Sequence, residues 1–206
     1  MAVTLDEYNN AESALRDEFA KIFALAARLH DVDANQRYGA NLPYSYHLNA
    51  VATLTMEYAP EVIAAVDDLL PLYFGACFHD SIEDARQTYN DVLAIARTFM
   101  DESQAVMATE IAYALTNDKG RTRAERAGER YYAGIRTTPY APMVKLADRL
   151  ANMTYSLQRA CQDANAERMV NVYRGEMPHF LAAITSDTAD PRLALPPSML
   201  ERINSL

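Results

Sequence analysis

Four ionisable side chains stand close together at the end of an apolar stretch. The segment LLPLYFGACF, residues 69–78, runs directly into His79 and Asp80, and Glu83 and Asp84 follow. If one helix continues through them, Glu83 lies one turn above His79, and Asp84 one turn above Asp80. Several acids beside an apolar core are unfavourable unless a cation or a proton compensates them. The pattern therefore indicates a metal centre.

The residue types suggest which side chains bind the ion. His79 and Asp80 offer a nitrogen and an oxygen ligand, whereas Glu83 and Asp84 would orient or deprotonate a water molecule. Two more ligands are needed. His47 is a candidate because it begins a helical stripe of apolar residues that should face the core. Asp148 is another because it lies between Leu146 and Leu150 in KLADRL, which should turn its side chain inward. Such a mixed nitrogen and oxygen set suits an octahedral divalent ion such as Mn²⁺.

Ordinary structural roles remain open for the same residues. A histidine at a helix C-terminus interacts favourably with the helix dipole, although acids one turn later oppose that dipole. His47 alone would be a core histidine with satisfied hydrogen bonds. Asp148 alone would form a salt bridge to Lys145 or Arg149. The interpretation as a metal centre therefore depends on the joint pattern.

Helices are expected to position these groups, because apolar residues recur at spacings of three and four and glycine is scarce. We predict an all-α fold. Capping boxes predict three helix starts, at Thr4 with Glu7, Thr88 with Asp91, and Asp101 with Gln104.

Other signals predict where the helices begin and end. The first helix should reach about residue 30, where we expect His30 and Asp31 to be solvated and not ligands. Pro43 should lie in the first turn of the helix that carries His47. A short helix is predicted in EVIAAVDDLL, a long one at about 141–163, and a last short one near the C-terminus.

Composition limits the class of protein. With 206 residues, half of them hydrophobic, the chain can form one globular domain over residues 1–206. Nineteen basic and twenty-eight acidic residues give a net charge of −9, which argues against a surface for duplex nucleic acid. Because neither a signal peptide nor a bilayer-spanning run is evident, we expect a soluble, cytoplasmic protein. Cys77 and Cys161 are expected to be buried free thiols.

Three segments occur in a characteristic order: RYGANLPYSYH at 37–47, FHDSIED at 78–84 and VKLADRLANM at 144–153. Together they resemble the HD-type hydrolase domain of RelA/SpoT homologues, which removes the 3′-pyrophosphate from the stringent-response alarmone (p)ppGpp. The resemblance covers about residues 20–160 and is strongest to the single-domain small alarmone hydrolases, which include the metazoan SpoT homologue. It implies an HD-domain helical bundle with a metal site between helices.

The resemblance also implies roles for individual residues. It gives His47, His79, Asp80 and Asp148 as ligands of one divalent ion, most often Mn²⁺, and Glu83 with Asp84 as the pair that activates water. Other positions match substrate contacts, with Arg37 for the base, Asn152 for the nucleotide and Lys119 for the phosphates. Candidates for holding the outgoing pyrophosphate are Lys145, Arg149, Arg121 and Arg123. The family pattern has lysine at Tyr38, and its loop to the first histidine is one residue shorter.

Other functions fit the same residues. The centre could hydrolyse another nucleotide, such as NADPH or a deoxynucleoside triphosphate. It could instead remove a pyrophosphate that a toxin synthetase places on tRNA, which would make this protein an antitoxin with a toxin as its genetic partner. A non-enzymatic alternative is a protein that only sequesters a nucleotide.

Overall fold

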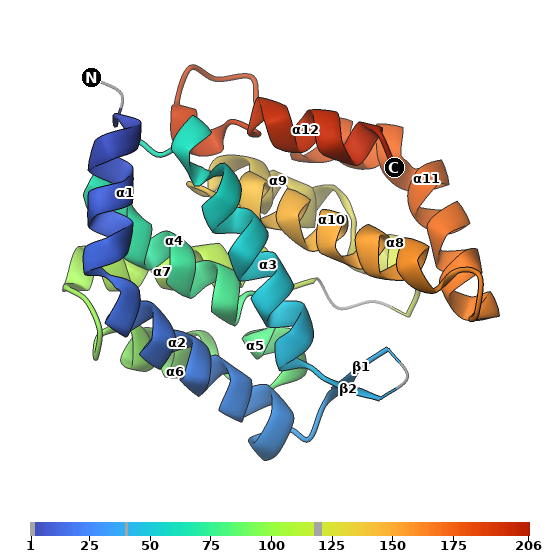
Figure 1. Ribbon diagram of the computed structural model, residues 1–206, viewed down its shortest axis with the longest axis horizontal. Coiled ribbons are helices and arrows are strands. Elements are labelled where there is room, and N and C mark those ends of the chain that lie inside the picture. Colours follow the sequence, from blue (N-terminus) through green and yellow to red (C-terminus); the bar gives the residue numbers. More distant parts are fainter. Residues whose placement is uncertain (1–2, 40, 118–120) are drawn as a thin grey trace.

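The structure, a computed structural model, describes residues 3–39, 41–117 and 121–206 and is an all-α helical bundle (Figure 1). The two strands among these residues form one short antiparallel hairpin. The elements in chain order are α1 (Leu5–Ala14), α2 (Arg16–Arg28), the π-helical turn η1 (Leu29–Asp33), β1 (Arg37–Tyr38), β2 (Leu42–Pro43), α3 (Ser45–Tyr58), the 3₁₀ turns η2 (Ala59–Glu61) and η3 (Val66–Asp68), α4 (Leu69–Phe78), α5 (Ser81–Asp84), α6 (Tyr89–Ala96), α7 (Glu102–Ala114), α8 (Arg123–Arg126), α9 (Glu129–Thr137), α10 (Ala141–Arg159), α11 (Ala164–Ile184), the 3₁₀ turn η4 (Pro191–Leu193) and α12 (Pro197–Asn204).

Helix α4 is the centre of the core. Every residue of it except Tyr73 is buried, because α2, α3 and α7 pack around it. A helix that is apolar on all sides is stable only when it is enclosed in this way. The contact with α7 is close: a Cβ atom added to Gly75 would lie 2.6 Å from Cγ2 of Ile111.

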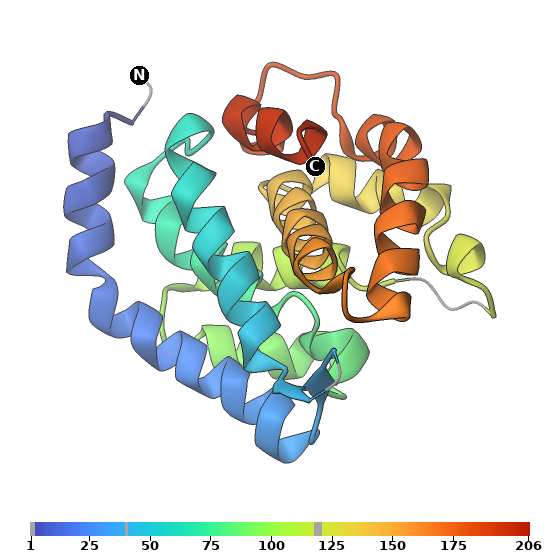
Figure 2. The ribbon, with the colours of Figure 1, turned by 45° about the vertical axis from the view of Figure 1, so that its right-hand side comes forward.

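The remaining helices lie on both sides of this centre. Helix α3 packs against both α4 and α10, and α10 packs in turn against α11 and α12. Figures 1 and 2 show α1 and α2 along one side of the molecule and α11 and α12 along the other. This arrangement brings the start of α3, the end of α4 and the middle of α10 together.

Several predicted element boundaries are confirmed and others are wrong. All three capping boxes are present. The first helix is interrupted at Leu15, so that α1 reaches η3 while α2 packs on α4. Pro43 lies in β2 and not in a helix, because Leu42–Pro43 pairs with Arg37–Tyr38. The EVIAAVDDLL segment forms a 3₁₀ turn before α4 instead of a separate short helix.

Helix α10 begins at an unusual residue. Tyr140 precedes it with φ of 64°, in the left-handed region that bulky side chains rarely adopt. Three hydrogen bonds hold it there. Its hydroxyl donates to Asp68 (2.5 Å), the Ala64 amide donates to the same hydroxyl (3.1 Å), and its own amide donates to the Arg192 carbonyl. The start of α10 is therefore fixed by segments outside it.

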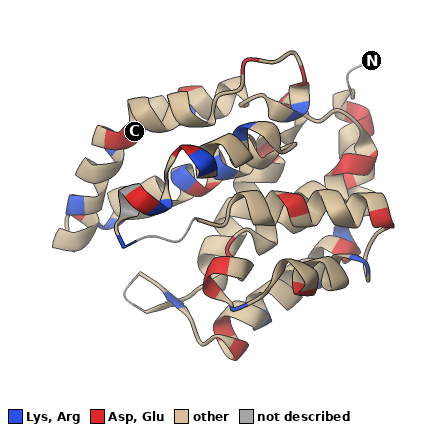
Figure 3. Ribbon diagram, turned by 180° about the vertical axis from the view of Figure 1, so that it is seen from behind, with Lys and Arg blue, Asp and Glu red and all other residues tan. Residues whose placement is uncertain are grey.

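Surface features agree only in part with the sequence. No helix in the described ranges combines the length and apolar character needed to cross a bilayer. Cys77 is a buried free thiol as predicted, but Cys161 is exposed. Seen from behind, acidic and basic positions are interspersed along the helices (Figure 3).

Replacing Gly75 by alanine should destabilise the fold. The added methyl group would overlap Ile111 and force α4 and α7 apart, at a cost of about 1–3 kcal/mol. Gly175→Ala in α11 is the matched control, because no atom beyond its own stretch of helix lies within 4 Å of the added methyl group. Chemical denaturation should show a lower free energy of unfolding for the first variant only. Equal stability of the two variants would contradict the close packing.

Candidate metal centre

Four ligand atoms converge from three distant parts of the chain. His47 lies in the first turn of α3, His79 and Asp80 follow α4, and Asp148 lies in the middle of α10. The atom pairs and their distances are His79 Nε2 to Asp80 Oδ2 2.9 Å, His47 Nε2 to His79 Nε2 3.3 Å, His47 Nε2 to Asp148 Oδ1 3.3 Å, and His47 Nε2 to Asp80 Oδ2 3.5 Å.

These distances fit a single divalent ion. Adjacent ligands of an octahedral ion with bonds of about 2.1 Å lie about 3.0 Å apart. Ligand atoms of His47, His79 and Asp80 all lie within 4.8 Å of one another. Asp148 is not one of these three residues and meets the group only through its contact with His47.

The hydrogen bonds of the imidazoles favour the same use. His79 Nδ1 lies 2.8 Å from the Ala76 carbonyl oxygen, which can only accept, so Nδ1 carries the proton. In the neutral ring Nε2 then presents a lone pair toward the other ligand atoms, as metal-binding histidines do. His47 is buried as well, and within the described part of the chain its Nδ1 has no hydrogen-bond partner. The donor set and its orientation therefore fit a divalent ion.

Neighbouring charges outweigh burial in setting the pKa values of His47, Asp80 and Asp148. Burial opposes the positive charge of His47, but the carboxylates of Asp148 and Asp80 outweigh it and raise the pKa of His47 to about 9. Burial likewise opposes the charge of Asp80, but the imidazoles of His79 and His47 hold the pKa of Asp80 well below its usual range. For Asp148, the Lys145 ammonium and His47 outweigh burial and lower the pKa. The buried acids thus remain ionised and available to a cation.

Glu83 and Asp84 lie beside this centre, but not on a continuing helix. Helix α4 ends at Phe78, and the separate short helix α5 begins after Asp80, whose ψ of 0° interrupts the helical path. The predicted stacking of Asp84 above Asp80 survives, since the Asp84 amide donates to the Asp80 carbonyl. Glu83 instead turns outward and accepts from the side-chain amide of Asn117 at 2.8 and 2.9 Å.

Tyr44 joins the two aspartates. Its hydroxyl lies 2.6 Å from Asp80 Oδ2 and 3.1 Å from Asp84 Oδ2. Burial and the charge of Asp80 raise the pKa of Asp84, and the Tyr44 hydrogen bond offsets part of this rise. A carboxylate with a raised pKa beside a metal site has the properties of a general base.

Asn152, which was predicted to contact the nucleotide, hydrogen-bonds Asp148. Its amide nitrogen donates to Asp148 Oδ1 at 2.6 Å and to the Asp148 carbonyl oxygen at 3.0 Å, and its oxygen accepts from the Tyr38 hydroxyl at 2.9 Å. The Tyr38 ring stacks on His47 at 4.9 Å between centroids. Lys145 donates to the other oxygen, Asp148 Oδ2, at 2.8 Å. Both carboxylate oxygens of Asp148 are therefore held in position.

The other basic residues that were predicted to contact the substrate do not gather at one place. Arg37 is exposed on the hairpin and donates to the Gln36 carbonyl. Arg149 is buried, pairs with Glu176 at 2.9 Å, and lies over the rings of Tyr173 and Phe180. Arg121 is exposed. Lys119 and the Arg123 side chain lie outside the described residues.

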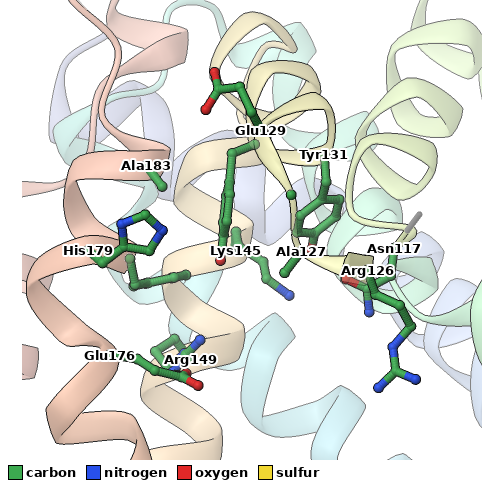
Figure 4. A pocket seen from close by; sticks show the side chains of 13 residues that line it. Asn117, Arg126, Ala127, Glu129, Tyr131, Lys145, Arg149, Glu176, His179 and Ala183 are labelled. Atoms are coloured by element: carbon green, nitrogen blue, oxygen red, sulfur yellow. The ribbon is translucent and has the colours of Figure 1, made fainter. Parts of the chain in front are cut away.

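A cavity of about 760 Å³ adjoins the centre, which is ample for a nucleotide. Figure 4 shows Asn117 and Arg126 at one end, Arg149, Glu176 and His179 at the other, and Lys145 between them. Because Asn117 binds Glu83 and Lys145 binds Asp148, the cavity opens beside the predicted ligands and acids.

Sequence reasoning missed two residues and misjudged a third. Tyr44 and Asn117 bind the acids. Tyr44 lies within the first segment of the resemblance, which could have drawn attention to it, whereas an asparagine after a helix end carries no distinctive signal. His30 was expected to be solvated, yet it is completely buried with its ring stacked on Tyr44. The prediction that His30 and Asp31 do not bind the ion stays a prediction. The prediction that His30 is exposed to solvent is wrong, because η1 folds back over the site and buries it.

Comparison with known proteins gives no further guide. No protein-family model matches this sequence, and no curated protein is significantly similar to it.

Asn152→Ala should weaken metal binding. The variant removes the amide that orients Asp148, and loss of such outer contacts lowers metal affinity by about 10–100-fold. Titration calorimetry with Mn²⁺ measures this change. Asn171→Ala, an exposed asparagine of α11, should leave the affinity unchanged. Equal affinities for both variants would exclude a role of Asn152 in holding Asp148.

Proposed function

We propose that the protein is a Mn²⁺-dependent pyrophosphohydrolase that removes the 3′-pyrophosphate from (p)ppGpp. The observation that carries the proposal is the cluster of His47, His79 and Asp80, whose ligand atoms lie 2.9–3.5 Å apart, with Asp148 3.3 Å from His47. These residues come from all three segments of the alarmone-hydrolase resemblance. A purely structural role does not explain why buried acids and imidazoles from distant helices point at one another.

The surroundings of the centre support a phosphate-bearing substrate. A divalent ion, when bound, supplies a Lewis acid that lowers the pKa of water and neutralises charge on a phosphate. Lys145 remains charged, because Asp148 outweighs burial and raises its pKa. Its ammonium lies in the wall of the cavity, where it adds positive charge beside the ligands. Arg126 and Arg149 line the same cavity, so basic side chains are present there for an anionic group to contact.

The acidic pair has separate tasks in this proposal. Asp84, half-buried and beside Asp80, takes the proton of the attacking water. Glu83 is held by Asn117, which lines one end of the cavity, and it orients that water. The phosphate enters the centre from this end of the cavity. Attack at the phosphorus next to the 3′-oxygen then releases pyrophosphate, and the 3′-oxygen takes up a proton.

Other substrates are compatible with the same centre. NADPH, deoxynucleoside triphosphates and pyrophosphorylated tRNA all present a phosphate to hydrolyse, and pure sequestration would need the cavity without the acidic pair. The preference for (p)ppGpp comes from the resemblance of the three segments. Incubation with Mn²⁺ and ppGpp, pppGpp, NADPH, deoxynucleoside triphosphates and modified tRNA, with analysis of the leaving group, separates these possibilities.

Asp148→Ala should abolish both Mn²⁺ binding and pyrophosphate release. It removes a ligand and leaves the Lys145 ammonium buried without its carboxylate. Because that buried charge can also destabilise the fold, Asp148→Asn provides a second variant of the same shape. Calorimetry and chromatography of the products measure the two effects. Persistent Mn²⁺-dependent hydrolysis in a folded variant would disprove the assignment.

Asp84→Asn and Glu83→Gln should retain metal binding and lose turnover. Removing the base lowers kcat by about 10²–10⁴-fold, since a neutral amide cannot accept the proton. Glu201→Gln, an exposed acid of α12, is the control. If ppGpp binding and the biological effect survive in Glu83→Gln while turnover is lost in vitro, sequestration and not hydrolysis is the function.

A further inference from the structure

His30 is buried at the edge of the candidate centre, where the proposed reaction gives it no task. It lies in η1, the π-helical turn at the end of α2, and its side chain is completely shielded from solvent. Single π-helical turns of this kind occur frequently at functional sites. After this wider turn the chain returns to the site, and the backbone N–H of Gln36 donates to the backbone carbonyl of His30 at 2.8 Å.

Two contacts connect the His30 ring to the acids of the site. Nδ1 lies 2.5 Å from Oε1 of Gln36, and the ring stacks on Tyr44 at 4.8 Å between centroids with planes 7° apart. Tyr44 in turn donates to the carboxylates of Asp80 and Asp84. The route through Tyr44 therefore leads from the imidazole to Asp84.

The hydrogen-bond chemistry fixes the protonation of this ring. The side chain of Gln36 also acts on Asp84, where it lowers the pKa of that carboxyl. A carboxylate accepts only, so the NH₂ group of Gln36 faces Asp84 and its carbonyl oxygen faces His30. The proton of neutral His30 then lies on Nδ1. Nε2 is buried and has no partner within the described residues, so the ring acts through Nδ1 and its face.

We propose that His30 is a positioning residue that orients Asp84 toward the attacking water, through Gln36 on one side and Tyr44 on the other. The inference rests on the proposed function, because that function assigns the proton transfer to Asp84. Asp31 strengthens the arrangement: its carboxylate accepts from the Ser45 amide at 3.0 Å and fixes the start of α3, which carries His47. The pair His30 and Asp31 thus serves the centre without binding the ion.

Two substitutions of His30 separate its contacts. His30→Phe keeps a ring to stack on Tyr44 but removes the N–H group, whereas His30→Asn keeps an N–H donor near the Nδ1 position. We expect His30→Phe to lower kcat by about 10–100-fold, with KM and Mn²⁺ affinity nearly unchanged, and His30→Asn to recover part of the loss. Tyr8→Phe, which loses a buried hydrogen bond to the Met56 carbonyl away from the centre, should leave kcat unchanged.

A double-mutant cycle with Gln36→Leu tests whether the two residues act as one chain. If His30 works through Gln36, the double variant His30→Phe with Gln36→Leu should be no slower than either single variant. Additive losses of kcat, or an unchanged kcat in His30→Phe, would overturn the inference while leaving the proposed function intact. An inactive wild-type protein would overturn the proposed function and the inference with it.

Nitrogen NMR gives a readout that needs neither substrate nor metal. In the metal-free protein, the His30 ring should show a protonated Nδ1 coupled to its hydrogen and an unprotonated Nε2. Gln36→Leu should increase the exchange of that hydrogen with solvent, because its acceptor is gone. A proton on Nε2 instead would overturn the inference.

Discussion

Two partly buried carboxylates, those of Asp80 and Asp148, require positive charge around them, and much of the site is arranged to supply it. An ionised acid away from water costs several kcal/mol unless it is paired and hydrogen-bonded. The Lys145 ammonium meets one side of Asp148, His47 contacts both acids, and His79 contacts Asp80. Without an ion, the Lys145 ammonium and the His47 imidazolium balance the two carboxylates, and a divalent ion would take the place of the His47 proton.

Local patterns predicted most of the helical framework. Capping boxes at Thr4, Thr88 and Asp101 place helix starts because their hydrogen bonds lie within one turn. The hairpin and the 3₁₀ turns escaped this reasoning. Pro43 is typical of a first helical turn, but its position in β2 depends on pairing with Arg37, which the helical pattern does not reveal.

For the candidate centre, the ligands were easier to predict than their supports. His79 and Asp80 stand out because their polarity breaks an apolar run, and Asp148 stands out in an apolar frame. Tyr44 and Asn117 do not, since their role depends on acids brought near only by the fold. His30 was misjudged for the same reason: its burial follows from Tyr44 and the π-helical turn, and neither is visible in local periodicity.

The start of α10 at Tyr140 has a consequence for the rotation of that helix about its own axis. Each residue of an α-helix turns the side-chain direction by about 100°, so a slip of one position would carry Asp148 away from His47 and Lys145 out of the cavity. Tyr140 resists such a slip because its hydrogen bonds to Asp68 and to the Arg192 carbonyl hold it in the left-handed backbone conformation. A neighbouring residue moved into this position would lack the hydroxyl that binds Asp68. The angular setting of Asp148 is thus determined about two turns earlier, at the residue where α10 begins.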